Sequence, residues 1–218
     1  KDGIRDHCVT GVQTCALPIS VNPAYNNSAL RAFCSALNER GGWDVEVRHL
    51  RVSGFSPGRD RSLMEGDFDA LFVLAGLFQP AIGPISQLFH QLHPKAPILL
   101  TPWARSPMVL GGLGPSAAST LVASPYPPQD AEPELKAYLQ RFQRRFGFQP
   151  NALAISSRQA IELLDQALAN GAQTPADVKR YLLSRRSHRT SLGTVHFNAY
   201  GDRTVPLHVF PATQEQRP

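Results

Sequence analysis

The stretch FDALFVLAG (68–76) is a short, mostly apolar run that ends in glycine. A strand in the middle of a parallel sheet has this composition, because helices cover both of its faces and leave no side for polar residues. No apolar run in the chain approaches the roughly 20 residues that a membrane-spanning helix needs. The stretch therefore predicts a buried strand rather than a membrane span.

Helices and strands alternate on both sides of this stretch. The expected elements are a helix from Ala29 to Leu37 that Asn26 or Asn27 caps and Gly41-Gly42 ends, a strand in WDVEVRHL (43–50), a helix from Ile82 to Leu92, a strand in APILLT (96–101), a short helix over 106–110 and a strand in STLVAS (119–124). Alternation with such short connections predicts a doubly wound parallel sheet. Ligands bind to such sheets beyond the carboxyl ends of the strands.

The chain changes character at SPYPPQDAEP (124–133), where four prolines predict a stiff linker. The elements expected beyond it are helices over Glu134–Phe146, Leu153–Asn170 and Pro175–Ser184, and strands in GTVHF (193–197) and VPLHVF (205–210). Two short strands cannot cover the apolar faces of three helices. The helices either form a small bundle or cover a sheet that lies outside this chain. We favour the second alternative, and we expect exposed apolar helix faces and marginal stability.

Charge gives little indication of a nucleic-acid or membrane partner. The chain has 218 residues, a net charge of +5 and a pI near 9.4, but its basic residues are scattered. The densest cluster, Arg185 to Arg189, lacks the interleaved aromatic residues that stack on bases. We interpret this cluster as a solvated helix end and turn rather than as a site for nucleic acid or anionic lipid.

The motifs of catalytic and metal sites are missing as well. The chain has no G-x-S-x-G elbow, and GGLGPSAAS (111–119) lacks the Lys-Ser/Thr pair of a phosphate loop. His90 and His93 have a spacing compatible with a metal pair, but no Cys or carboxylate lies nearby in sequence. An exposed helix face is therefore the favoured interpretation of these histidines. We expect no catalytic residue, no metal and no cofactor.

Two stretches resemble a known family. AYLQRFQRRFGFQPNA (137–152) and GTVHFNAYGD (193–202) are similar to motifs of type I periplasmic binding proteins of the branched-chain amino acid receptor type. Further similarity follows the family's order over residues 21–210. The resemblance implies an α/β fold with two lobes joined by three crossovers. It places a Rossmann-like second-lobe subdomain at 21–127, helices and strands that return to the first lobe and hinge at 128–210, and a tail at 211–218.

The resemblance also implies a ligand site in the loops after the strands. The residues expected to line it are Tyr25 in NPAYNN, Gly76, Leu77 and Phe78 after the strand in 68–76, and Trp103, Ala104, Arg105 and Ser106 after the strand in 96–101. Half-buried packing is an equal alternative for Tyr25, and a solvent-facing side chain is one for Arg105. No carboxylate in the last loop could hold a ligand ammonium, so we hypothesise that the ligand is not a simple zwitterion held by this lobe but an anionic or uncharged compound.

The function that the resemblance implies is that of a periplasmic solute-binding component of an ABC transporter, with a permease as its partner. It would close two lobes around a small amino-acid-like, amide or carboxylate ligand by hinge motion. One alternative is a regulator or sensor on the same fold, such as a penicillin-binding protein activator lipoprotein or a receptor domain. A flavodoxin-like enzyme domain ranks last, because NPAYNN lacks the residues of a phosphate loop.

The first 20 residues match nothing in the family. RDHCVTGVQTCALPIS (5–20) resembles the translation of a short-read sequencing adapter. We therefore expect residues 1–20 not to be natural protein, which would leave Cys34 as the only native cysteine. Any export signal would then lie in coding sequence that precedes this stretch.

Overall fold

The computed structural model describes residues 12–19, 23–48, 55–75, 80–128 and 132–214. The chain divides into two compact units. Unit 1 contains the residues up to Ala123 and those from Val209, and unit 2 contains Ser124–His208. The predicted α/β class is confirmed in unit 1, which is built around a largely parallel sheet.

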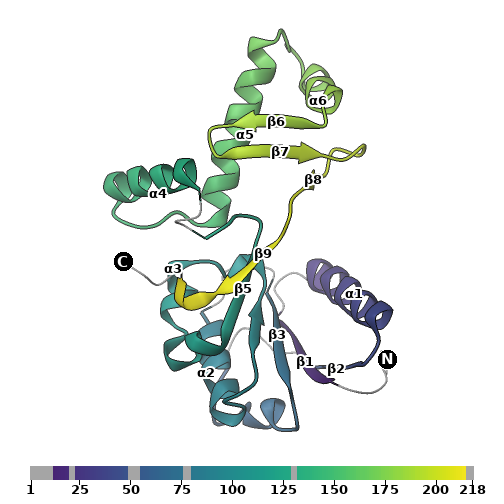
Figure 1. Cartoon of the computed structure of the whole chain (residues 1–218), viewed down its shortest axis with the longest axis vertical. Helices are drawn as coiled ribbons and strands as arrows, with labels where there is room; N and C mark the ends of the chain where they lie inside the picture. Colours follow the sequence, from purple (N-terminus) through teal and green to yellow (C-terminus); the bar gives the residue numbers. More distant parts are fainter. Residues whose placement is uncertain (1–11, 20–22, 49–54, 76–79, 129–131, 215–218) are drawn as a thin grey trace. The chain divides into compact units, whose positions relative to one another are not determined.

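Unit 1 is a six-stranded sheet of order β2-β1-β3-β4-β5-β9, in which β1 to β5 pair in parallel (Figure 1). Its elements are β1 (Val12–Ile19), α1 (Pro23–Arg40), β2 (Trp43–Val47), η1 (Arg61–Met64), β3 (Ala70–Ala75), α2 (Ile82–Leu92), β4 (Ile98–Leu100), η2 (Pro102–Ala104), α3 (Pro107–Gly111), η3 (Gly114–Ser119), β5 (Thr120–Ser124), β9 (His208–Pro211) and η4 (Ala212–Gln214). The strand predicted in 68–76 is β3, and it lies inside the sheet.

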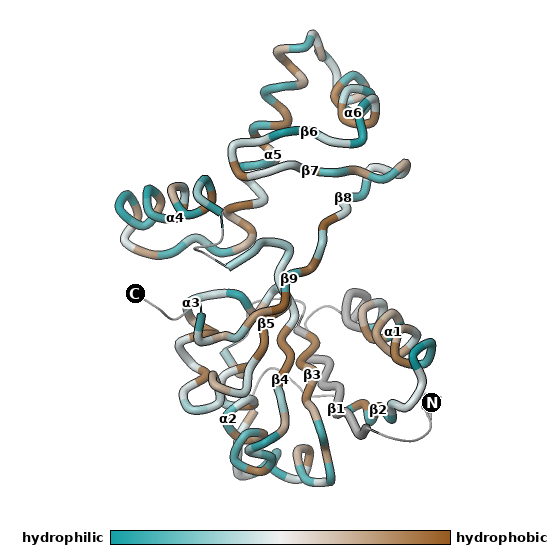
Figure 2. Tube along the Cα trace, viewed as in Figure 1, coloured by the Kyte–Doolittle hydropathy of each residue, from teal (hydrophilic) through white to brown (hydrophobic). Residues whose placement is uncertain are grey.

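Helices cover both faces of this sheet, because successive side chains of a strand point to opposite sides. On one face, the Phe33 ring of α1 lies 4.3 Å from the Phe72 ring of β3. On the other face, Leu71 and Val73 are buried in one cluster with Phe89 of α2. The apolar strands β3, β4 and β5 stand out in brown in Figure 2. The predicted double winding is therefore confirmed.

Helix α1 begins four residues earlier than a cap at Asn26 predicts. Pro23 is its first residue, a position where proline fits because the N–H that it lacks would have no partner there. The predicted end is confirmed: Gly41 and Gly42 have φ angles of 68° and 77°. These angles lie in the left-handed region that favours glycine.

Strand β1 lies within the stretch that resembles a sequencing adapter. It pairs with β2 over residues 12–16 and with β3 over residues 14–19. Pro18 therefore falls beyond the end of β2, where β1 has a pairing partner on one side and tolerates a missing N–H. A strand at this place does not test the origin of the residues, so a non-native segment 1–20 stays a prediction.

Unit 2 contains three helices and a small antiparallel sheet of order β6-β7-β8. Its elements are α4 (Pro133–Phe146), α5 (Ala152–Ala169), α6 (Pro175–Ser184), β6 (Ser187–Thr190), β7 (Gly193–Phe197) and β8 (Arg203–Thr204). The helix-end-and-turn interpretation of Arg185 to Arg189 is wrong for its second half. His188 and Thr190 are buried on one side of β6, and the His188 ring packs 5.3 Å from that of Tyr181.

One face of α5 is apolar and exposed. Ile155, Leu163 and Ala167 are buried within unit 2. The opposite face carries the α5 stripe, which we define as the exposed residues Leu153, Ile161, Leu164 and Leu168. The predicted exposure of apolar helix faces is confirmed here. Within the described residues, no helix is both long enough and apolar enough to cross a membrane.

Candidate ligand-binding site

The carboxyl ends of the parallel strands bring the predicted loops to one edge of the sheet in unit 1. Tyr25 lies in the first turn of α1, after β1, and Trp103 to Ser106 follow β4. Gly76, Leu77 and Phe78 follow β3, but they lie outside the described residues, as does the side chain of Tyr25. Because β1, β3 and β4 are parallel, the segments that leave them start at the same edge.

The strand order also marks one point along this edge where the two faces of the sheet diverge. Strands β1 and β3 are neighbours, yet the helices that follow them, α1 and α2, cover opposite faces of the sheet (Figure 1). The chain thus leaves the two strand ends in opposite directions, and such a divergence opens a crevice in doubly wound folds. The described elements nearest this point are the ends of β1 and β3 and the first turn of α1, which contains Tyr25.

The loop after β4 is rigidly built. Pro102 to Ala104 form a 3₁₀ turn, and the Ala104 N–H donates to the Thr101 carbonyl at 2.9 Å. Ser106 caps α3, and its Oγ accepts from the Val109 N–H at 3.3 Å. Every predicted residue of this loop is therefore held by backbone geometry, which is the arrangement that a preformed binding surface needs.

The four predicted residues of this loop differ in exposure. Ala104, Arg105 and Ser106 are buried, whereas Trp103 is half-buried. The alternative that Arg105 points into solvent is wrong, because only 7% of it is exposed. Its guanidinium carbon lies 5.1 Å from the centre of the Phe210 ring in β9. A cation over an aromatic face is stabilised by the ring quadrupole, so Arg105 has a packing role in unit 1.

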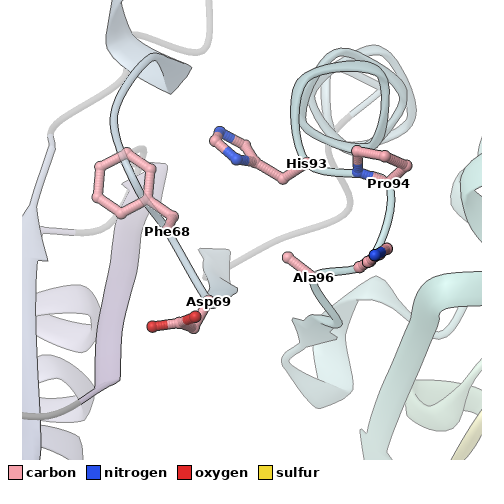
Figure 3. A pocket seen from close by; sticks show the side chains of 6 residues that line it. Phe68, Asp69, His93, Pro94 and Ala96 are labelled. Atoms are coloured by element: carbon pink, nitrogen blue, oxygen red, sulfur yellow. The ribbon is translucent and has the colours of Figure 1, made fainter.

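A second concave site lies at the opposite, amino edge of the sheet. It has a volume of about 290 Å³, and it is lined by Phe68, Asp69, His93, Pro94, Lys95 and Ala96 (Figure 3). Since Asp69 precedes β3 and Ala96 precedes β4, this pocket is separate from the predicted ligand site. Phe68 and His93 face each other across it with ring centres 5.8 Å apart.

The histidines of α2 and its end do not form an exposed face, contrary to the sequence-based interpretation. His93 is half-buried, and its Nε2 lies 2.8 Å from the Met64 carbonyl oxygen. His90 is also half-buried, with Nδ1 3.2 Å from the Ser119 Oγ. Each ring bonds a different neighbour, so the pair has a structural role. Among the described residues, no three His, Cys, Asp or Glu side chains gather in a group that could hold a metal.

Sequence reasoning missed a polar cluster in unit 2. Tyr126, in the proline-rich linker, is buried, and its hydroxyl bonds Gln159 of α5 and Arg203 of β8. Tyr126 and Arg203 are 77 positions apart, so no local pattern relates them. A tyrosine between prolines in a linker was the one available signal, because a large aromatic residue there needs a packing partner.

Neither a protein-family model nor a curated protein matches the sequence. Several solved structures, however, are similar to this chain in fold. A leucine-binding protein from Thermotoga maritima has a TM-score of 0.74 and 21% identity, over 90% of this chain and 56% of its own. A branched-chain amino acid transporter substrate-binding protein from Streptococcus pneumoniae, in complex with isoleucine, has a TM-score of 0.71 and 16% identity, over 90% and 56%.

A third structure, an ABC transporter solute-binding protein from R. palustris in complex with benzoate, has a TM-score of 0.71 and 13% identity, over 91% of this chain and 54% of its own. These three similar structures are all solute-binding proteins, and the chain shares their fold over about nine-tenths of its own length. It spans about half of their length.

Proposed function

We propose that this chain is the later part of a solute-binding protein that delivers a small molecule to an ABC transporter permease. The observation that carries the proposal is the match in fold over nine-tenths of the chain, together with the predicted loops at one carboxyl edge. The ligand is amino-acid-like, an amide or a carboxylate, and the protein acts outside the cytoplasm without catalysis or cofactor. Closure of two lobes around the ligand belongs to the same proposal.

In this proposal, unit 1 is the second lobe and the helices of unit 2 belong to the first lobe. The α5 stripe supports this assignment. It extends over 16 residues, or about 22 Å from its first to its last residue, which is enough to cross several strands of a sheet. A groove of about 380 Å³ continues it toward α6, lined by Leu164, Leu168, Gln173, Thr174, Pro175 and Val178. A sheet encoded upstream would bury this surface.

The two tryptophans of the chain provide a matched test of where the ligand binds. Trp103 follows β4 at the carboxyl edge, whereas Trp43 begins β2 at the opposite edge. The full-length protein encoded at the locus is titrated with leucine, valine, succinate, benzoate and benzamide, followed by calorimetry and tryptophan fluorescence. We expect a bound ligand to change the emission of Trp43→Phe, which keeps Trp103, but not that of Trp103→Phe.

The outcomes separate the parts of the proposal. If none of these compounds binds, the transport role loses its support and the regulator alternative gains it. Binding that changes only the emission of Trp43 would move the site away from the carboxyl edge. Binding of leucine or valine would overturn the hypothesis of an anionic or neutral ligand while leaving the solute-binding role in place.

A further inference from the structure

Arg203 and Tyr126 form a polar pair inside unit 2. The Nη1 of Arg203 donates to the Tyr126 hydroxyl at 2.7 Å, and the guanidinium carbon lies 5.1 Å from the centre of the tyrosine ring. Tyr126 is only 3% exposed. Both residues lie near the ends of unit 2 in sequence: Tyr126 follows its first residue by two positions, and Arg203 precedes its last residue by five.

The hydroxyl of Tyr126 has a defined orientation. It donates its one proton to the Gln159 Oε1 at 3.1 Å and lies 2.8 Å from the Ser156 Oγ. Gln159 is itself buried, and its Nε2 donates to the Leu192 carbonyl at 3.1 Å. With its proton committed, the hydroxyl accepts from Arg203 through a lone pair. The guanidinium is therefore held at one nitrogen by a fixed acceptor.

The other two nitrogens of Arg203 lack such an acceptor. Nε is shielded from solvent and has no hydrogen-bond partner within the described residues. In the described part of the chain, Nη2 makes no hydrogen bond either, and no carboxylate there forms an ion pair with Arg203. A buried N–H of a charged group that lacks an acceptor is costly. Nε and Nη2 lie on the same edge of the guanidinium, which is the edge that matches the two oxygens of a carboxylate.

We propose that this edge of Arg203 is a carboxylate-binding subsite, in which Nε and Nη2 each donate to one oxygen of the ligand's carboxylate. The inference rests on the proposed function and specifies the chemistry of its ligand. Leucine, isoleucine and benzoate, named with the similar structures, all carry a carboxylate. Tyr126 is the positioning residue, because it orients the guanidinium without touching the ligand. Arg105 is engaged with Phe210 and is not needed for this role.

The test uses the full-length protein with benzoate and benzamide as probes, because they share a ring and differ in charge. Arg203→Lys keeps the positive charge but loses the paired donors, and Arg185→Lys makes the same change at an exposed arginine of unit 2. We expect Arg203→Lys to weaken benzoate binding about tenfold or more by calorimetry, with benzamide and the control variant little affected. Tyr126→Phe should weaken benzoate binding by a smaller factor.

An NMR readout on the wild-type protein keeps the inference falsifiable if Arg203→Lys fails to fold. The Nε–H proton resonance of Arg203 should move downfield when benzoate is added, because a carboxylate hydrogen bond deshields it. A resonance that benzoate leaves unchanged means that water or an acidic side chain occupies the edge, and the inference is overturned. Equal benzoate binding by Arg203→Lys and wild type also overturns it and leaves the proposed function intact. If none of leucine, valine, succinate, benzoate and benzamide binds the wild type, both proposals fail; if benzamide alone binds, only the carboxylate subsite is overturned.

Discussion

Gly83 of α2 lies where α2 crosses the end of α3, and we expect Gly83→Ala to destabilise unit 1. A Cβ atom at this position would lie 2.5 Å from the carbonyl oxygen of Gly112 and 2.8 Å from its carbon. Both distances are shorter than real Cβ contacts. The obstacle is backbone, which cannot rotate away as the end of a side chain could, so the two helices must separate.

The size of the effect follows from three contributions. Ordinary contact begins at 3.4 Å, so the backbones must move apart by about 0.9 Å, and overpacking of this kind costs about 1–3 kcal/mol. The same carbonyl accepts from the Gln87 Nε2 at 2.7 Å, and a displaced acceptor weakens that bond by up to about 1 kcal/mol. Alanine regains about 1 kcal/mol of helix propensity. The net loss is therefore up to about 3 kcal/mol, and each kcal/mol lowers the midpoint of thermal unfolding by roughly 2–4 °C.

Circular dichroism during urea and thermal unfolding measures this loss. The matched control is Gly111→Ala, because a Cβ at Gly111 meets nothing within 4 Å and the residue belongs to the neighbouring α3. We expect the control to be as stable as wild type or up to about 1 kcal/mol more stable, because it gains helix propensity without a clash. A Gly83→Ala protein as stable as the control would show that α2 and α3 do not approach as closely as described, and the reasoning would fail.

Three further predictions concern unit 2 and the first residues. The Thr174 hydroxyl and nearby backbone N–H groups hold the pKa of Asp177 below its ordinary value, so this carboxylate stabilises α6 at pH above 4, and the stabilisation is lost as the pH falls through the lowered pKa. We expect the difference in urea midpoint between wild type and Asp177→Asn to shrink from pH 7 to pH 3; a constant difference would contradict this. The α5 stripe should bind the dye anilinonaphthalene sulfonate in the 218-residue chain, and Ile161→Asp with Leu164→Asp should reduce the fluorescence, whereas unchanged fluorescence would place the dye elsewhere. Resequencing of the locus should replace residues 1–20, and genuine coding sequence running in frame through them would refute the adapter interpretation.

Sequence patterns predicted the elements of unit 1 well, because the burial of these elements shows as a local pattern of apolar residues. β3 and β4 are apolar on both sides, and α2 repeats its apolar positions at helical spacing, so each was predicted to within two residues or so. The carboxyl-edge loops followed from the family resemblance, and the parallel order of the strands explains why these loops share an edge.

The remaining features depend on partners distant in the chain. Strand β6 is polar in sequence, and it becomes a strand because His188 finds Tyr181 and the Leu182 carbonyl oxygen. The burial of Arg105 depends on Phe210, which lies about half the chain away. Neither relation leaves a periodic signal in the sequence. The residues of β6 were therefore interpreted as a helix end and turn, and the choice between a buried and a solvent-facing Arg105 was left open.

The division of unit 1 between two pieces of chain has a consequence for biosynthesis. Phe210 and Ala212 belong to the same buried cluster as β3, β4 and α2, yet all of unit 2 is translated between them. At about 5–20 residues per second, that interval lasts on the order of ten seconds. During it, the nascent sheet has an unpaired edge at β5 and a gap in its core. The sheet of unit 1 therefore gains its last strand only after the whole of unit 2 has been translated.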